Sequence, residues 1–314
     1  MQSCLMETME EAGDEITVGH LKKICMEILE AAERAQAADM EGAATDIIPL
    51  TDIQKRYTNE LSIRGNRFAI TAHRPTYILL AAYNSSEANE EPFVLAGDDS
   101  TFKGTESKFQ VSLKFLLAED LIGNNGAIYA GYTNRSFWQV YDSTDSSPFR
   151  ETNHEPEIWF SWNTRWRFLG VTNRVVRGGF VHQSNGRGGT LSRSWNRLFA
   201  EFIFEKGKYS GSFKPWWRIP EDADNDDNPD IDDYLGYFEF LNVYTKSNHS
   251  FSVMLRNNLR SSKNRGAVQV EWNFPLLKYL DGYVQWFNGY GESLIDYNHN
   301  VNSFGIGVSL TDWL

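Results

Sequence analysis

From about residue 66 onward, apolar and polar residues alternate in short runs separated by polar connections. In one run, Val111 and Leu113 alternate with Gln110 and Ser112. A period of two places successive side chains on opposite faces of a β-strand. Roughly twelve such runs follow one another with no helical pattern between them. They lie at about residues 74–84, 105–117, 127–142, 152–163, 174–184, 195–206, 208–218, 234–245, 249–258, 266–274, 280–289 and 301–313.

The lengths of the connections between these runs distinguish between two possible all-β folds. A β-sandwich and a β-barrel show the same alternation, but outer-membrane barrels have short turns at one end and long loops at the other. Here long polar connections alternate with shorter ones, and an even number of strands can close without leaving edges. The pattern predicts a twelve-stranded antiparallel transmembrane β-barrel. Pro215 interrupts one run and predicts a bulge or irregular pairing there.

The first part of the chain has a different character. Residues 14–45 have the composition of a short amphipathic helix, and a turn-rich linker is expected at 49–64. We therefore expect an N-terminal extension over 1–65, partly helical, and a barrel domain over 66–314. Cys4 and Cys25 are either a disulfide or two idle thiols, and we favour the disulfide.

Composition narrows the class of protein. No stretch approaches the roughly 20 apolar residues of a membrane-spanning helix, which excludes a helical membrane protein but not a barrel. The formal net charge of -12 argues against a nucleic-acid partner, because binding phosphates requires clustered Lys and Arg. The sequence is also 14% aromatic, and aromatic residues gather near the ends of runs, as at a membrane-water boundary.

Candidate chemistry lies in the hairpin formed by the fifth and sixth runs. His182 and Ser184 are two residues apart near the end of one run, so both face the same side. If the strands pair as a hairpin, Asn196 on the return strand shares this face. The three residues predict a relay in which Ser184 is the nucleophile, His182 takes its proton and Asn196 orients the imidazole. The competing interpretation is an ordinary polar loop, since G-x-S-x-G is absent.

Two segments of this hairpin, 182–187 and 192–197, resemble the active-site signature of bacterial outer-membrane phospholipase A. Segments 146–153, 227–231 and 289–298 are also similar to that family, in the same order, and the resemblance extends from about residue 68 to the C-terminus. It implies calcium-dependent hydrolysis of acyl esters of phospholipids and lysophospholipids, a phospholipase A1/A2 activity, in the bacterial outer membrane. The relay residues implied are Ser184, His182 and Asn196.

The resemblance also implies a Ca²⁺ cofactor and an active homodimer. Its calcium ligands correspond to the Arg187 carbonyl and the Ser192 hydroxyl of one subunit and the Ser146 hydroxyl of the other. Residues at the dimer surface correspond to Val111, Leu113 and Leu310. Asn134 stands where the family pattern has a glutamine, which predicts a shorter or absent hydrogen bond across the dimer.

Alternatives to this interpretation remain. The acidic run 221–233 is not an EF-hand, because Asp227 replaces the turn glycine and Pro229 interrupts the loop, but it is either a second calcium site or a solvated loop. The other histidines, including His154, show no metal-ligand spacing. The alternative function is a non-enzymatic barrel, porin-like or binding, with a vestigial site.

Overall fold

The computed structural model describes residues 52–62, 69–98, 100–143 and 147–313. All of these belong to one compact unit, Thr51–Leu314. The helix expected within 14–45, the Cys4–Cys25 disulfide and Ser146 lie outside the described residues. Within the described ranges, no helix is long and apolar enough to cross a membrane.

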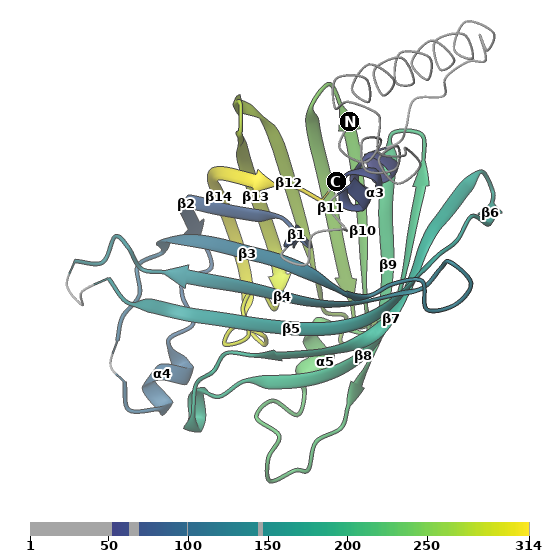
Figure 1. Ribbon diagram of the computed structural model, residues 1–314. Coiled ribbons are helices and arrows are strands. Elements are labelled where there is room, and N and C mark those ends of the chain that lie inside the picture. The colour runs from purple at the N-terminus through teal and green to yellow at the C-terminus, as the bar shows by residue number, and fades with distance from the viewer. Residues whose placement is uncertain (1–51, 63–68, 99, 144–146, 314) are drawn as a thin grey trace, which may run out of the picture. The chain divides into compact units, whose positions relative to one another are not determined.

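Twelve long antiparallel strands close into a barrel (Figure 1). The sheet has 14 strands, but β1 (Thr71–Ala72) and β6 (Arg167–Phe168) are two-residue strands beside β3 and β7. Pairing of β2 with both β14 and β3 completes the ring. The long strands are β2 (Thr76–Asn84), β3 (Thr105–Ala118), β4 (Ala127–Trp138), β5 (Phe149–Asn163), β7 (Val171–Ser184), β8 (Ser194–Lys206), β9 (Tyr209–Ile219), β10 (Phe238–Lys246), β11 (His249–Asn257), β12 (Gly266–Leu277), β13 (Leu280–Tyr290) and β14 (Asn300–Thr311). This confirms the predicted barrel, and each expected run overlaps one long strand.

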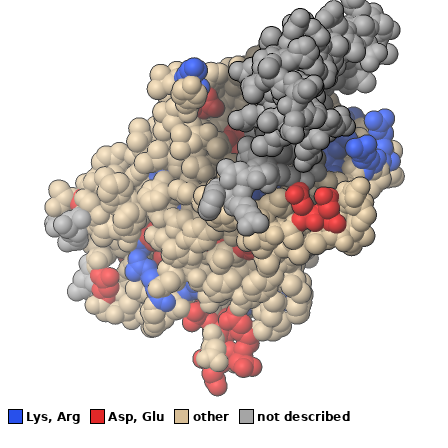
Figure 2. Space-filling model, viewed as in Figure 1, with Lys and Arg blue, Asp and Glu red and all other residues tan. Residues whose placement is uncertain are grey.

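The alternation in sequence becomes a polar interior and an apolar exterior. On β3, Gln110, Ser112 and Lys114 are buried, whereas Val111 is 44% exposed. A membrane barrel shows this arrangement because the lipid takes the apolar face and the lumen takes the polar one. The face in view in Figure 2 carries few charged side chains over the strands, and acidic side chains gather at its lower tip.

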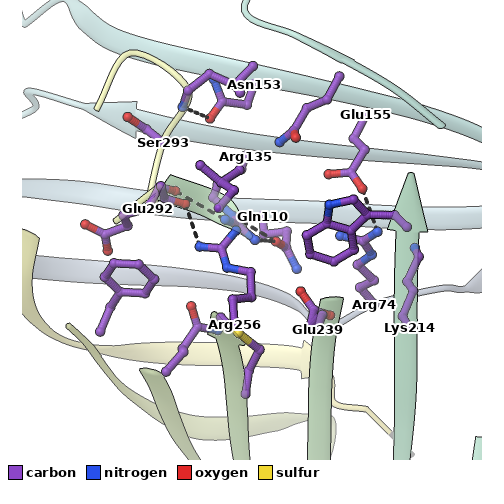
Figure 3. Close-up of a pocket in the computed structure, with 18 of the residues that line it drawn as sticks. Arg74, Gln110, Arg135, Asn153, Glu155, Lys214, Glu239, Arg256, Glu292 and Ser293 are labelled. Atoms are coloured by element: carbon purple, nitrogen blue, oxygen red, sulfur yellow. Dashed lines mark hydrogen bonds and ion pairs between the residues drawn. The ribbon is translucent and has the colours of Figure 1, made fainter. Parts of the chain in front are cut away.

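Ion pairs and hydrogen bonds fill the lumen (Figure 3). Arg74 lies 2.7 Å from Glu155, and Lys108 on β3 lies 2.8 Å from Glu292 in the β13–β14 loop. The cavity that remains among the residues of Figure 3 is about 60 Å³. A second cavity, between helix α3 (Asp52–Ser62) and the inward-facing side chains of the strands, is about 140 Å³. Cavities of these sizes hold small groups of water molecules, so the lumen does not favour the porin-like alternative.

Loop segments fold into the barrel end where the long connections lie. The short helices α4 (Glu91–Leu95) and α5 (Ile231–Leu235) belong to these connections. Side chains of α5 and of the β13–β14 loop pack with Trp195 and Trp216 in one buried cluster. This apolar cluster supports β7 and β8 from inside the barrel, and we expect it to restrict movement of their ends.

The prediction of a turn-rich linker at 49–64 is wrong, because helix α3 (Asp52–Ser62) occupies most of this range. The Arg56 guanidinium donates to the carbonyls of Trp313, Ala72 and His73. Glu60 lies 2.8 Å from Lys114, whose side chain points into the lumen. Contacts distant in sequence therefore stabilise α3, and the local sequence carried no clear signal of them.

Irregular pairing at Pro215 is confirmed. The β8–β9 ladder pairs Phe199 with Trp216 and Phe202 with Phe213, and no pairs are formed between these two. The register is the same on both sides of the gap, so the irregularity is an interruption and not a bulge. Proline has no N–H to donate to a ladder, which accounts for the missing pairs.

Candidate active site

The predicted relay residues lie on the outer face of the β7–β8 hairpin. In its register His182 is opposite Asn196, and Ser184 is opposite Ser194. Val181 and Trp195, one position away on each strand, are 1% and 0% exposed and point into the barrel. Because neighbouring side chains alternate between faces, His182, Ser184 and Asn196 point outward at the long-loop end.

The structure joins two of these side chains directly. His182 Nδ1 lies 2.9 Å from Asn196 Oδ1. An amide oxygen only accepts hydrogen bonds, so Nδ1 carries the proton and Nε2 is left as the acceptor. No hydrogen bond joins the described side chains of Ser184 and His182. Catalytic hydrogen bonds of this kind often form only when substrate is bound.

Asn185 holds the loop that follows Ser184. Its side chain is 5% exposed, donates to the Leu191 carbonyl at 2.8 Å and accepts from the backbone N–H groups of Arg187 and Arg193. Gly186 has a φ of 66°, in the left-handed region that favours glycine. The tight turn and the buried amide together determine where the loop leaves the strand.

Trp195 supports the hairpin from behind. Its indole Nε1 donates to Gln183 Oε1 at 2.8 Å, and the Arg197 guanidinium lies 3.9 Å from the centre of its ring. The buried indole has a partner for its only polar group, as a buried tryptophan requires. A shift of one residue between the strands would turn Trp195 outward, so its burial helps maintain the His182–Asn196 register.

Comparisons with known proteins identify the family. The profile of the phospholipase A1 family matches residues 53–310. The chain belongs to the phospholipase A1 family. A phospholipase A1 of Salmonella typhimurium is 38% identical over 254 residues, covering 81% of this chain and 86% of that protein.

Solved structures agree on the fold. A Salmonella typhi outer membrane phospholipase dimer with bound calcium has a TM-score of 0.73 and 37% identity, covering 79% of this chain and 94% of that one. An active-site mutant of Escherichia coli outer membrane phospholipase A, in which an asparagine is replaced by alanine, has a TM-score of 0.75 and 36% identity, covering 82% and 97%. The predicted resemblance is confirmed, and this phospholipase A1 family member is an outer-membrane β-barrel.

Three side chains beside the site were given no role from the sequence, although Asp227 begins the segment 227–231 that resembles the family. Glu221 Oε1 accepts a hydrogen bond from Asn196 Nδ2 at 3.1 Å. His154 on β5 pairs in register with Ser184, and its Nδ1 lies 2.7 Å from the Tyr132 hydroxyl. Asp227 Oδ2 accepts from the Ser192 hydroxyl at 2.6 Å. All three come from other elements, so no spacing within the hairpin could have identified them.

The residues expected to bind calcium are placed in part. Ser192 and Arg187 lie in the β7–β8 loop, while Ser146 is outside the described residues. The Arg187 guanidinium donates to the Arg150 carbonyl at 2.6 Å, which anchors this loop to β5. Among the described residues no cluster of three or more His, Cys, Asp or Glu is arranged to hold a metal ion. The Ser192 hydroxyl, the Arg187 carbonyl and the Asp227 carboxylate all offer oxygen atoms, which are the ligands that calcium prefers.

The acidic run 221–233 is partly anchored. The Arg218 guanidinium contacts both carboxylate oxygens of Asp226, at 2.6 and 2.7 Å. The buried Asn228 accepts a hydrogen bond from the Ser194 backbone N–H at 2.9 Å. These contacts tie the run to β9 and to the β7–β8 hairpin, while Asp222, Asp224 and Asp227 are exposed.

An apolar strip continues along the outer face from the relay residues. Phe180 pairs with Leu198, next to the His182–Asn196 pair, and Gly178 pairs with Ala200 beyond it. Phe180 and Leu198 are 36% and 47% exposed. The site of this family member therefore adjoins a surface suited to hydrocarbon chains.

The residues expected at a dimer surface also face outward. Val111 and Leu310 are 44% and 67% exposed, and Leu113 is half-buried on the same face of β3 as Val111. Asn134 is half-buried on β4, with its Nδ2 3.5 Å from His154 Nδ1. Their part in a dimer stays a prediction.

Proposed function

We propose that this chain is a calcium-dependent phospholipase of A1/A2 type. It hydrolyses acyl esters of phospholipids and lysophospholipids, with Ser184 as nucleophile, His182 as general base and Asn196 as the residue that orients His182. The observation that carries the proposal is the 2.9 Å hydrogen bond between His182 and Asn196, on the lipid-facing side and beside Ser184.

The reaction follows serine-hydrolase chemistry. Ser184 Oγ attacks the ester carbonyl carbon, and its proton passes to His182 Nε2. His182 then gives this proton to the departing alcohol of the lysophospholipid or glycerol derivative, leaving an acyl group on Ser184. Water attacks the acyl group, His182 takes its proton and returns it to Ser184, and a fatty acid leaves. Asn196 keeps the Nδ1 proton in place throughout.

The surface around the relay supports a lipid substrate. The exposed Phe180 and Leu198 adjoin the relay and face the same side, where an acyl chain lies in a membrane. A substrate in the outer leaflet would meet Ser184 without leaving the bilayer. The two cavities inside the barrel, in contrast, are about 60 and 140 Å³ and are too small for a phospholipid.

The Ca²⁺ ion belongs to the proposal as well. We assign to it the Arg187 carbonyl and Ser192 hydroxyl of one subunit and Ser146 of a second, as the calcium-bound Salmonella typhi dimer supports by its similarity. When bound, calcium would stabilise negative charge on the carbonyl oxygen. The Asp227 carboxylate, which accepts a hydrogen bond from the Ser192 hydroxyl, adds negative charge that favours a cation at this place.

The test of the function is hydrolysis of phospholipid in mixed micelles by the refolded full chain. We expect release of fatty acid with calcium and almost none with a chelator. Ser184→Ala should lose activity by at least about a thousandfold, because the nucleophile is removed. Ser261→Ala, the same change at an exposed serine of the β11–β12 loop, has no part in the relay and serves as a control. Retained turnover in Ser184→Ala, with the heat-modifiable folded form present, would refute this assignment.

A further inference from the structure

Glu221 lies two residues beyond the end of β9 and reaches Asn196 from a third segment of chain. Ile219, the last residue of β9, pairs with Asn196 in the register. In a chain that remains extended, residue 221 faces the same side as residue 219, and Pro220 favours an extended backbone at Ile219. The Glu221 side chain is half-buried, and its Oε1 lies 3.1 Å from Asn196 Nδ2.

Glu221 is a carboxylate without a described basic partner. Three acids of its loop do pair with arginines: Asp226 and Asp232 with Arg218, and Asp233 with Arg260. Among the described residues, Glu221 forms no salt bridge, and the bond with Asn196 is its one side-chain hydrogen bond. Its negative charge is therefore directed at the relay.

We infer that Glu221 is a fourth member of the relay, a positioning residue that acts on His182 through Asn196. This inference rests on the proposed function of Ser184, His182 and Asn196. A carboxylate accepts hydrogen bonds and cannot donate them, so it binds only the NH₂ side of the Asn196 amide. The amide oxygen is thereby turned toward His182, where it accepts from Nδ1–H.

Two consequences follow for the imidazole. First, the tautomer of His182 is determined by a chain of three groups, since an amide turned the other way would present NH₂ to Nδ1 and favour the Nε2–H tautomer. That tautomer cannot take a proton from Ser184. Second, the carboxylate polarises the Asn196 amide and stabilises the imidazolium formed in the transition state. A neutral asparagine thus gains part of the electrostatic effect that an aspartate has in other triads.

Two substitutions of Glu221 separate the effect of its hydrogen-bond acceptor from the effect of its charge. Glu221→Gln keeps an acceptor oxygen but loses the charge, whereas Glu221→Ala loses both. We expect kcat to fall by about tenfold or more in Glu221→Ala and by less in Glu221→Gln, while KM changes less than about twofold. Asp224→Asn, an exposed acid of the same loop, is the matched control and should behave as wild type.

A double-mutant cycle shows whether Glu221 acts through Asn196. In an Asn196→Ala background, Glu221→Ala should cause no further loss of kcat, because the intermediary is already absent. If the losses in kcat multiply, or if Glu221→Ala leaves kcat unchanged, the inference is overturned. Heat-modifiable mobility of each variant confirms that the barrel has folded.

A spectroscopic measurement does not depend on turnover. Nitrogen-15 NMR of His182 should show the Nδ1–H tautomer in the wild type and in Asp224→Asn, and a mixture of tautomers in Glu221→Ala. An unchanged tautomer in Glu221→Ala would overturn the inference. If wild type hydrolyses no phospholipid but the tautomer changes as expected, the proposed function fails and the positioning role of Glu221 stands.

Discussion

At the scale of single residues, the proposed relay depends on Asn196. Its side chain bridges His182 and Glu221, at 2.9 and 3.1 Å. An amide suits this place because it accepts on one side and donates on the other. An aspartate would accept on both sides and would face the Glu221 carboxylate directly.

We expect Asn196→Ala to reduce kcat by about 10- to 1000-fold, a smaller loss than for Ser184→Ala. Without the amide, His182 still adopts the productive tautomer for part of the time. Steady-state hydrolysis assays measure the effect, and Asn242→Ala on β10 serves as an asparagine control remote from the hairpin. A loss equal to that of Ser184→Ala would show that Asn196 is needed for folding of the hairpin and not only for orientation.

Asn196→Asp should also be impaired, although aspartate is the usual orienting residue of serine hydrolases. Two carboxylates at hydrogen-bonding distance repel each other, so the introduced carboxylate would be displaced from His182 or protonated. Glu221→Gln supplies an NH₂ group in place of the second carboxylate, and the double variant should recover activity relative to Asn196→Asp alone. Absence of this recovery would contradict a direct contact between the two side chains.

At the scale of elements, helix α3 depends on the barrel it contacts. Burial alone would raise the pKa of Glu60, but the neighbouring Lys114 and Arg56 lower it below its ordinary value. A carboxyl with a depressed pKa contributes stability above the unfolded pKa, and this contribution is lost as pH falls through the folded one. The salt bridge with Lys114 therefore stabilises docking of α3 at neutral pH.

We expect α3 to detach when the pH falls below about 4, the region where glutamate carboxyls protonate. Hydrogen exchange of residues 52–62, measured from pH 7 to pH 3, should show increasing exposure after correction for the intrinsic rate. Glu60→Gln should expose the helix already at pH 7 and show little further change on acidification. Equal protection at both pH values in the wild type would contradict the role of Glu60.

The contacts of α3 also bear on where the barrel domain begins. The division into an extension, 1–65, and a barrel domain, 66–314, stays a prediction. All strands of the described residues follow residue 65, yet Arg56 and Glu60 bind the barrel. A chain that begins at residue 66 would lack Glu60 and would leave Lys114 buried without its carboxylate partner. This loss costs stability even where the barrel still folds.

At the scale of the whole molecule, we propose that the active form is a homodimer. The calcium assignment requires it, because Ser146 and the Arg187–Ser192 loop would complete one site only across an interface. The exposed Val111 and Leu310 give this interface an apolar surface in the lipid layer. The family pattern has a longer glutamine at the position of Asn134. We therefore expect a weaker polar contact across the interface.

Mixing two inactive chains tests the shared site. Ser184→Ala keeps the calcium ligands, and Ser146→Ala keeps the relay, so each homodimer should have little activity. In the heterodimer, the Ser146→Ala chain has an intact relay and loop and receives the Ser146 hydroxyl from its partner. Calcium-dependent hydrolysis should reappear, up to about a quarter of the wild-type rate for random pairing with one working site in each heterodimer. No recovery, although crosslinking shows heterodimers, would mean that calcium is bound within one chain or is not needed.

The sequence alone determined the barrel, its strands and the hairpin with His182, Ser184 and Asn196. These features depend on residues close together in the sequence. Alternation with a period of two indicates which face each residue occupies, and a hairpin joins strands that follow one another in the chain. The family was also evident, from the two segments that carry the relay.

Only the tertiary structure decided which side chains from other segments meet this hairpin. Glu221, His154 and Asp227 reach it from the β9–β10 loop and from β5. Helix α3 likewise forms where a linker was expected, since its charges have partners on the barrel. Such contacts depend on how the ring closes and how loops fold back over it, and no periodicity along the chain records that.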